Sequence, residues 1–181
     1  TARQKGVDRA RNEITNSKCK VYNAIEVNKV FDGLEGIPTL TTDVLPRVKV
    51  DMVSWSSYEG KTPDGLKMYK GIDIIRQHLI PTPYMKGEKV VFIGEIGKPE
   101  NIKNETRESI REFWDLNMGV YFAQDIPYII HWELFCNENK DDSPRLQDRN
   151  KTADELKGFW LIRPDGSRGW AQEYFEELLN N

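Results

Sequence analysis

The chain has 181 residues, enough for one domain with a buried core. Its formal net charge is -3 and charged residues make up 30%, without a long block of one sign, which argues against a nucleic-acid-binding protein with a basic face. No apolar run approaches the roughly 20 residues of a membrane span, and no signal-peptide pattern opens the chain.

Helical periodicity and strand-like runs alternate along the chain, beginning with a helix. Residues 2–14 carry Val7, Ala10 and Ile14 at helical spacing and predict an amphipathic helix. A short helix is expected over residues 42–46, with Thr42 or Asp43 as its cap. Three further helices are predicted, over residues 66–79, 105–116 and 170–179.

Apolar, β-rich runs predict four strands, over residues 20–30, 50–58, 90–96 and 128–136. The third run is apolar over residues 90–93 and reaches Glu95, which lies between Gly94 and Gly97. Such a run is typical of a strand buried on both faces in a parallel sheet. Because parallel sheets place their chemistry at the carboxyl ends of strands, Glu95 marks a candidate site.

The polar stretch of residues 140–157 is too charged to be core, so we expect it to form an exposed excursion. The whole of residues 1–181 is expected to form a single unit. Residues 158–167 predict a further strand with a Pro-Asp-Gly turn. Cys19 and Cys136 are too few and too far apart for a zinc site or a disulfide framework. No metal or organic cofactor is therefore implied.

Repeated strand, loop and helix units predict an α/β fold with a parallel sheet. An open doubly wound sheet and a TIM barrel compete for this pattern. No glycine-rich phosphate loop follows the first strand, and polar or aromatic residues end all four strands, which favours the barrel. A closed barrel needs about 200 to 250 residues, so four units predict the C-terminal half of a (β/α)8 TIM barrel, a fragment of a larger chain.

The order of residues 21–28, 50–58, 92–97 and 128–134 resembles strands five to eight of retaining TIM-barrel glycoside hydrolases, the clan that includes cellulase-like enzymes. The tail Gly-Phe-Trp-Leu-Ile-Arg-Pro-Asp-Gly, which begins at Gly158, is similar to that of bacterial cellulase-like barrel proteins. The resemblance implies that Glu95 is the catalytic nucleophile. It matches Trp132 to a tryptophan under the reacting sugar, and Tyr58 to the tyrosine of a His-x-Tyr pair in which Ser56 replaces the histidine. Ordinary packing in the barrel is the alternative role for both aromatic residues.

Two more polar pairs are candidates for contacts with a sugar. Glu26 and Asn28 share one face of the first strand, where they either line the site or form a structural hydrogen-bonded pair. Asn137, in the loop after the fourth strand, is a further candidate, although Asn137 and Glu138 also fit an ordinary loop. The substrate-binding set expected from the sequence is Glu26, Asn28, Ser56, Tyr58, Trp132 and Asn137.

The resemblance implies hydrolysis of a poly- or oligosaccharide by two glutamates, of which only Glu95 is found here. In that clan, the glutamate of an Asn-Glu pair on the fourth strand is the general acid/base. Asn12-Glu13 is such a pair but lies on a predicted helix, so the general acid/base is expected in a missing N-terminal half. Two alternatives stay open: a carbohydrate-binding barrel without catalysis, and a structural half-barrel that self-associates through open edges. An extracytoplasmic location would suit a bacterial glycosidase, but no sequence signal assigns the compartment.

Overall fold

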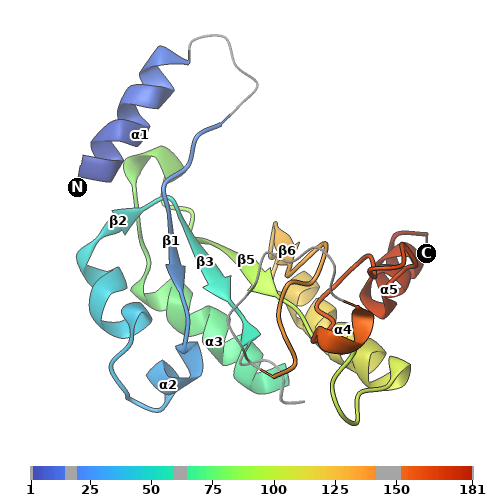
Figure 1. Ribbon diagram of the computed structural model, residues 1–181. Helices are drawn as coiled ribbons and strands as arrows, with labels where there is room; N and C mark the ends of the chain where they lie inside the picture. Colours follow the sequence, from blue (N-terminus) through green and yellow to red (C-terminus); the bar gives the residue numbers. More distant parts are fainter. Residues whose placement is uncertain (1, 15–19, 59–64, 142–151, 181) are drawn as a thin grey trace.

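A computed structural model describes residues 2–14, 20–58, 65–141 and 152–180 as an α/β fold around a parallel sheet. The sheet has four strands, whose spatial order follows their order along the chain (Figure 1). From one edge to the other they are β1 (Ala24–Val27), β3 (Met52–Ser56), β5 (Val90–Ile96) and β6 (Ile129–His131). All three pairings are parallel, which confirms the predicted class of sheet.

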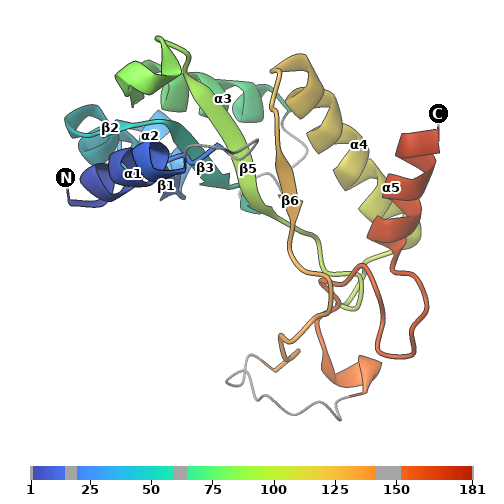
Figure 2. The same ribbon diagram turned by 90° about the horizontal axis from the view of Figure 1, so that it is seen from above.

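Helices follow the strands and pack on one face of the sheet (Figure 2). They are α2 (Val30–Leu34), α3 (Gly65–His78), α4 (Arg107–Ala123) and α5 (Trp170–Asn180). Their apolar sides enclose Trp55 of β3 and Ile93 of β5, both fully buried. Among the described residues, no helix is long and apolar enough to cross a membrane.

The other face of the sheet carries no second layer in the described part of the chain. Along β5, Val91 and Ile93 are buried toward the helices, whereas Phe92 and Glu95 on the opposite side are only half-buried. The prediction that this strand is buried on both faces is therefore wrong for the described chain, because helices cover one face only. We call this uncovered side the open face.

Strands β1 and β6 are the two edges of the sheet, so it does not close into a barrel within the described residues. Both are also shorter than predicted. After β6 the chain leaves the sheet because its backbone bonds the tail instead: the amide of Glu133 donates to the carbonyl of Phe159 at 2.7 Å, and that of Ile162 to Leu134 at 3.1 Å. Residues 158–167 accordingly form no strand, although the predicted turn is present, with Gly166 at a φ of 83°.

Short elements complete the chain around the sheet. Strands β2 (Lys49–Val50) and β4 (Ile80–Pro81) form a small parallel pair, and single turns occur as η1 (Leu40–Val44), η2 (Leu45–Arg47), η4 (Pro83–Met85) and η5 (Ala153–Glu155). The predicted cap of η1 is wrong, because Thr39, whose hydroxyl accepts from the amide of Thr42 at 3.3 Å, holds that position. Most of the 140–157 excursion lies outside the described residues.

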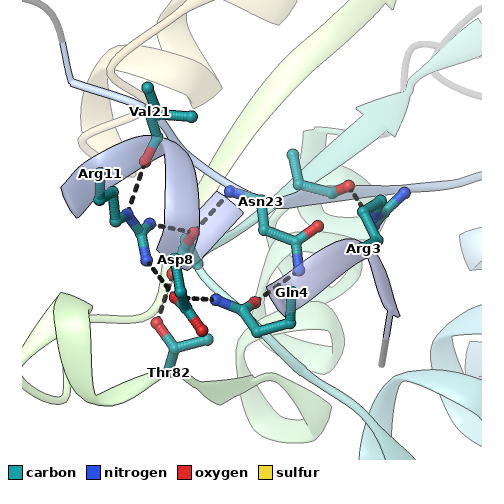
Figure 3. A network of polar contacts seen from close by, with 9 residues as sticks. Arg3, Gln4, Asp8, Arg11, Val21, Asn23 and Thr82 are labelled. Atoms are coloured by element: carbon teal, nitrogen blue, oxygen red, sulfur yellow. Dashed lines mark hydrogen bonds and ion pairs between the residues drawn. The ribbon is translucent and has the colours of Figure 1, made fainter. Parts of the chain in front are cut away.

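Helix α1 (Ala2–Glu13) lies at the end where the strands begin and has a different kind of attachment (Figure 1). Val7 and Ala10 are only half-buried and Ile14 is exposed, so the predicted amphipathic helix buries none of its apolar side chains. Polar contacts hold it instead. Arg11 forms an ion pair of 2.6 Å with Asp51, and Gln4 accepts a 2.7 Å hydrogen bond from Asn23 (Figure 3).

Asp51 is the centre of this attachment and is fully buried. Besides the guanidinium of Arg11, its carboxylate accepts hydrogen bonds from the amide of Asn23 and the hydroxyl of Thr82 (Figure 3). A buried carboxylate is tolerated only where charge and hydrogen-bond donors compensate its desolvation, as these groups do here. One residue thus joins α1 to the start of β3 and to the segment after β4.

Candidate functional site

The carboxylate of Glu95 lies at the carboxyl end of the central strand and accepts hydrogen bonds on both oxygens. The Tyr58 hydroxyl donates to Oε1 at 2.8 Å and the Ser56 hydroxyl to Oε2 at 3.1 Å. The register between β3 and β5 shifts at this point, from Trp55 opposite Ile93 to Ser56 opposite Glu95. This irregularity brings Glu95 and Ser56 together across the two strands.

Glu26 reaches the same hydroxyl from the edge strand. Ser56 also donates to a carboxylate oxygen of Glu26, whose own strand pairs with β3. A hydroxyl carries one proton, so Ser56 divides its donation between the carboxylates of Glu26 and Glu95. The structure therefore joins four predicted site residues in one polar network, three on neighbouring strands and Tyr58 just after β3: Glu26, Ser56, Tyr58 and Glu95.

Two glycines permit the close approach of the chain around Glu95. A Cβ at Gly94 would overlap the hydroxyl oxygen of Ser54 on the neighbouring strand. A Cβ at Gly97 would overlap the carbonyl oxygen of Trp132, whose amide donates to Ile96 at 2.8 Å. The glycines seen beside Glu95 in the sequence are thus required by backbone and side-chain crowding.

Tyr58 is held in its protonated form. Burial, and then its hydrogen bond to Glu95, raise the pKa of the phenol well above its usual value, and the negative charges of Glu95, Glu138 and Glu133 act in the same direction. Tyr58 is therefore a hydrogen-bond donor to Glu95 across the ordinary pH range. It is neither a base nor a nucleophile in this site.

Trp132 follows β6, and a carboxylate holds its indole ring. Its Nε1–H donates to Glu138 Oε1 at 3.0 Å, and Lys157 Nζ lies 3.5 Å from Glu138 Oε2. The backbone repeats the connection, because the amide of Lys157 donates to the carbonyl of Glu138 at 2.9 Å. Glu138, for which the sequence left an ordinary loop role open, is the link between Trp132 and the tail.

A pocket of about 380 Å³ opens beside Glu95. Its walls combine charged, phenolic and apolar side chains from the segment after β3, from β5 and the loop that follows it, from the loop after β6, and from the tail with the residue before it: Tyr58, Glu95, Pro99, Ile102, Glu138, Lys157 and Phe159. A carboxylate beside aromatic and hydroxyl groups in a concave surface is suited to bind a polar organic molecule such as a sugar.

Three predicted residues lie outside this network: Trp132, which is linked to the pocket through its bond to Glu138, and two asparagines. Asn28 is exposed just after β1, and no contact to Glu95 or to the pocket places it in the site. Asn137 is also exposed; its backbone amide donates to the Glu133 carboxylate at 3.2 Å, while the neighbouring Glu138 lines the pocket. The sequence thus favoured Asn137, whereas the residue of this loop that lines the pocket is Glu138, one position later.

The pocket wall formed by the tail depends on Glu100, a residue that the sequence did not mark. Its buried carboxylate accepts hydrogen bonds from the Trp160 indole, from Arg163 Nε at 2.6 Å and from the amide of Trp170 at 2.7 Å. Next to it, the amide of Asn101 donates to the carbonyl of Lys157 at 3.0 Å. These bonds hold the tail against the loop after β5.

The arrangement supplies an oriented carboxylate, a phenol that donates to it and an aromatic ring near a pocket. Within residues 2–14, 20–58, 65–141 and 152–180, no group of three His, Cys, Asp or Glu side chains is placed to hold a metal ion.

Comparison with protein-family models, with curated proteins and with solved structures finds no match to this chain.

Proposed function

We propose that this chain is the C-terminal half of a (β/α)8 barrel glycoside hydrolase and that Glu95 is its catalytic nucleophile. One observation carries the proposal: Glu95 lies at the carboxyl end of the inner strand β5 and accepts hydrogen bonds from Tyr58 and Ser56 beside a pocket. The parallel order of four strands, with a helix after each, supports the barrel.

In a retaining mechanism, Glu95 attacks the anomeric carbon and forms a glycosyl-enzyme intermediate, which water then hydrolyses. Each carboxylate oxygen has two acceptor positions, so the bonds from Tyr58 and Ser56 orient Glu95 and leave a lone pair for the attack. Trp132, fixed by Glu138, would lie against the sugar. The reaction needs no metal or organic cofactor.

A second glutamate must protonate the leaving oxygen, about 5 to 5.5 Å from the nucleophile. In this proposal it belongs to an N-terminal half-barrel, which pairs with the edges β1 and β6 and covers the open face. The exposure of Tyr128 and Ile130 beside the half-buried Phe92 supports such a partner, because apolar groups on one sheet face are ordinarily covered by another layer.

The test uses the longer protein that the proposal requires. It should hydrolyse a β-linked oligosaccharide with retention of anomeric configuration, and a 2-deoxy-2-fluoro glycoside should label the peptide that contains Glu95. Glu95→Gln should lower kcat by about 10³-fold or more. Glu88→Gln, an exposed residue before β5, is the matched control and should leave kcat unchanged. Label on another carboxylate, or full activity of Glu95→Gln, would remove Glu95 from this role.

Ser56 favours a second candidate, a carbohydrate-binding barrel without catalysis. Where the resembling enzymes carry a histidine, Ser56 shares its hydroxyl between Glu26 and Glu95. A binding protein would retain saccharide affinity in Glu95→Gln and show no turnover in either form. The structural alternative, self-association of half-barrels through β1 and β6, predicts a dimer in sedimentation experiments.

A further inference from the structure

Three consecutive residues, at the end of β3 and just after it, bond to Glu95. The hydroxyls of Ser56 and Tyr58 donate to the two carboxylate oxygens, at 3.1 Å and 2.8 Å. Between them, the amide of Ser57 donates to the carbonyl oxygen of Glu95 at 2.8 Å. The 56–58 segment therefore sets the position of both the backbone and the carboxylate of Glu95.

The side chain of Ser57 points away from the site, to the face of the sheet that the helices cover. Side chains alternate along a strand, so Ser57 shares this face with Val53 and Trp55. Its hydroxyl lies 2.6 Å from the hydroxyl of Tyr121 on α4, and both residues are fully buried. Helix α4 thus contacts the middle residue of the segment that bonds to Glu95.

Tyr121 is itself held within α4. Burial raises the pKa of its phenol, which therefore keeps its proton and donates it to Asn117 Oδ1 at 3.3 Å. Asn117, one turn earlier and fully buried, donates in turn to the carbonyl of Phe113 at 2.7 Å. A hydroxyl carries one proton, so Tyr121 accepts the hydrogen bond from Ser57. A directed chain of hydrogen bonds runs from Ser57 to the backbone of α4.

The bond between Ser57 and Tyr121 is suited to fix a position. Its surroundings are apolar, since Tyr121 belongs to the buried core that the helices form with the sheet. Replacing both partners of a buried hydrogen bond by apolar groups of similar shape is often nearly neutral for stability. Unlike an apolar contact, however, a hydrogen bond holds its two groups at one distance and in one direction.

We propose that Tyr121 is a positioning residue for Glu95, which it holds in place through Ser57 and the 56–58 segment. Ser56 and Tyr58 are covalently joined to Ser57, so a displacement of Ser57 moves the donors to both carboxylate oxygens. The catalytic consequence rests on the proposed function, because a nucleophile must be held within about 0.5 Å of its productive position.

The ¹³C carboxyl resonance of Glu95, assigned by its loss in Glu95→Gln, measures this link in the 181-residue chain without a substrate. Tyr58→Phe removes the donor to Oε1 and defines the direction in which the resonance moves when that bond is lost. Tyr121→Phe removes the accepting hydroxyl and keeps the ring. We expect it to shift the Glu95 resonance in the same direction, because the bond from Tyr58 is weakened. An unshifted resonance would overturn the inference.

Ser57→Ala breaks the same bond from the other side and decides the question if Tyr121→Phe does not fold. The double variant should show the shift of either single variant, since one bond is broken only once; additive shifts would contradict the link.

Thr82→Val is the matched control. It removes a buried hydroxyl that bonds Asp51 at the other end of β3, and it should lower stability without moving the Glu95 resonance. A shift in this variant would mean that the resonance follows stability, and would overturn the inference.

In the longer protein, Tyr121→Phe should lower kcat about tenfold and change KM by less than about twofold, because it displaces the nucleophile and removes no side chain of the pocket. Wild-type kcat in this variant would overturn the inference. A longer protein that hydrolyses no glycan would instead overturn the proposed function, and the resonance of Glu95 in the 181-residue chain would still decide the role of Tyr121.

Discussion

Gly97 shows how a single missing methyl group holds the site together. The carbonyl oxygen of Trp132 occupies the position that a Cβ at residue 97 would take, and Phe159 lies beside it. A backbone atom cannot rotate away as a side chain can, so crowding here must separate the end of β5 from the segment after β6. That separation would move Trp132 relative to Glu95.

We therefore expect Gly97→Ala to destabilise the fold by about 1–3 kcal/mol, the usual cost of overpacking. The measurement is urea unfolding of the chain. Gly119→Ala is the matched control: no atom lies within 4 Å of its Cβ position in the exposed part of α4, so the substitution should be neutral or stabilise by about 0.5–1 kcal/mol. Equal stability of the two variants would mean that the crowding at Gly97 is relieved without cost.

Part of the network was predictable because its residues follow a local rule. Side chains that end neighbouring parallel strands share one edge of the sheet, which is why Glu26, Ser56 and Glu95 could be placed together from the sequence. Lys157 and Phe159 could not, because their positions depend on backbone bonds to residues about 20 to 60 positions away in the chain. No periodic pattern in the sequence records such pairings.

Among the secondary-structure elements, the order was predictable and the strand lengths were not. Apolar runs at 20–30 and 128–136 were long enough for nine residues or more, but β1 keeps four residues and β6 three. Both are edge strands, and an edge strand extends only as far as its single neighbour pairs with it. For β6, the backbone after His131 forms hydrogen bonds with the tail in place of the sheet.

His131 makes the contact between β6 and α5 sensitive to acid. Its imidazole packs against Trp114, with ring centroids 5.5 Å apart, and against Phe175 at 5.9 Å, and both ring nitrogens are buried. Burial lowers the pKa of His131 from 6.5 to about 4, against an opposing contribution from the backbone of Glu133. The folded chain therefore binds this proton less readily than the unfolded chain does.

Because the folded-state pKa is depressed, the neutral imidazole stabilises the fold above about pH 6.5, and this contribution is lost as the pH falls toward 4. We expect the wild-type chain to lose about 2 kcal/mol of stability between pH 7 and 5 from this group, and His131→Phe to lose correspondingly less. Urea unfolding at both pH values measures the difference. The wild-type pH dependence in His131→Phe would contradict the assignment.

The attachment of helix α1 to the rest of the chain depends on Arg11. Arg11→Met leaves the fully buried Asp51 without its cation, and we expect a loss of about 3 kcal/mol together with faster hydrogen exchange of α1 amides. Arg9→Met removes an exposed ion pair with Glu13 and should cost less than about 0.5 kcal/mol. Unchanged protection of α1 in Arg11→Met would show that its remaining polar contacts suffice.

For the whole molecule, the open face distinguishes a self-sufficient domain from half of a larger one. Ile130 of β6 is 53% exposed in this chain. If an N-terminal half-barrel covers it, the same position becomes buried in the longer protein, where a charge without a partner is costly.

Ile130→Lys should therefore change the stability of the 181-residue chain by less than about 0.5 kcal/mol, and destabilise the longer protein by about 2 kcal/mol or more. Leu179→Lys, at a position 83% exposed on α5, should be neutral in both. Thermal or urea unfolding of the two lengths gives the comparison. A small effect of Ile130→Lys in the longer protein would show that the open face stays uncovered there.

The bonds of Glu100 have a consequence for biosynthesis. Its carboxylate accepts hydrogen bonds from Trp160, Arg163 and Trp170. These bonds hold the segment before α5 that supplies Lys157 and Phe159 to the pocket. Ribosomes make the chain from its N-terminus, so Glu95 and Tyr58 leave the ribosome long before the groups that complete Glu100. The bonds that fix the wall formed by Lys157 and Phe159 are therefore complete only after Trp170 has been made, long after Tyr58 and Glu95.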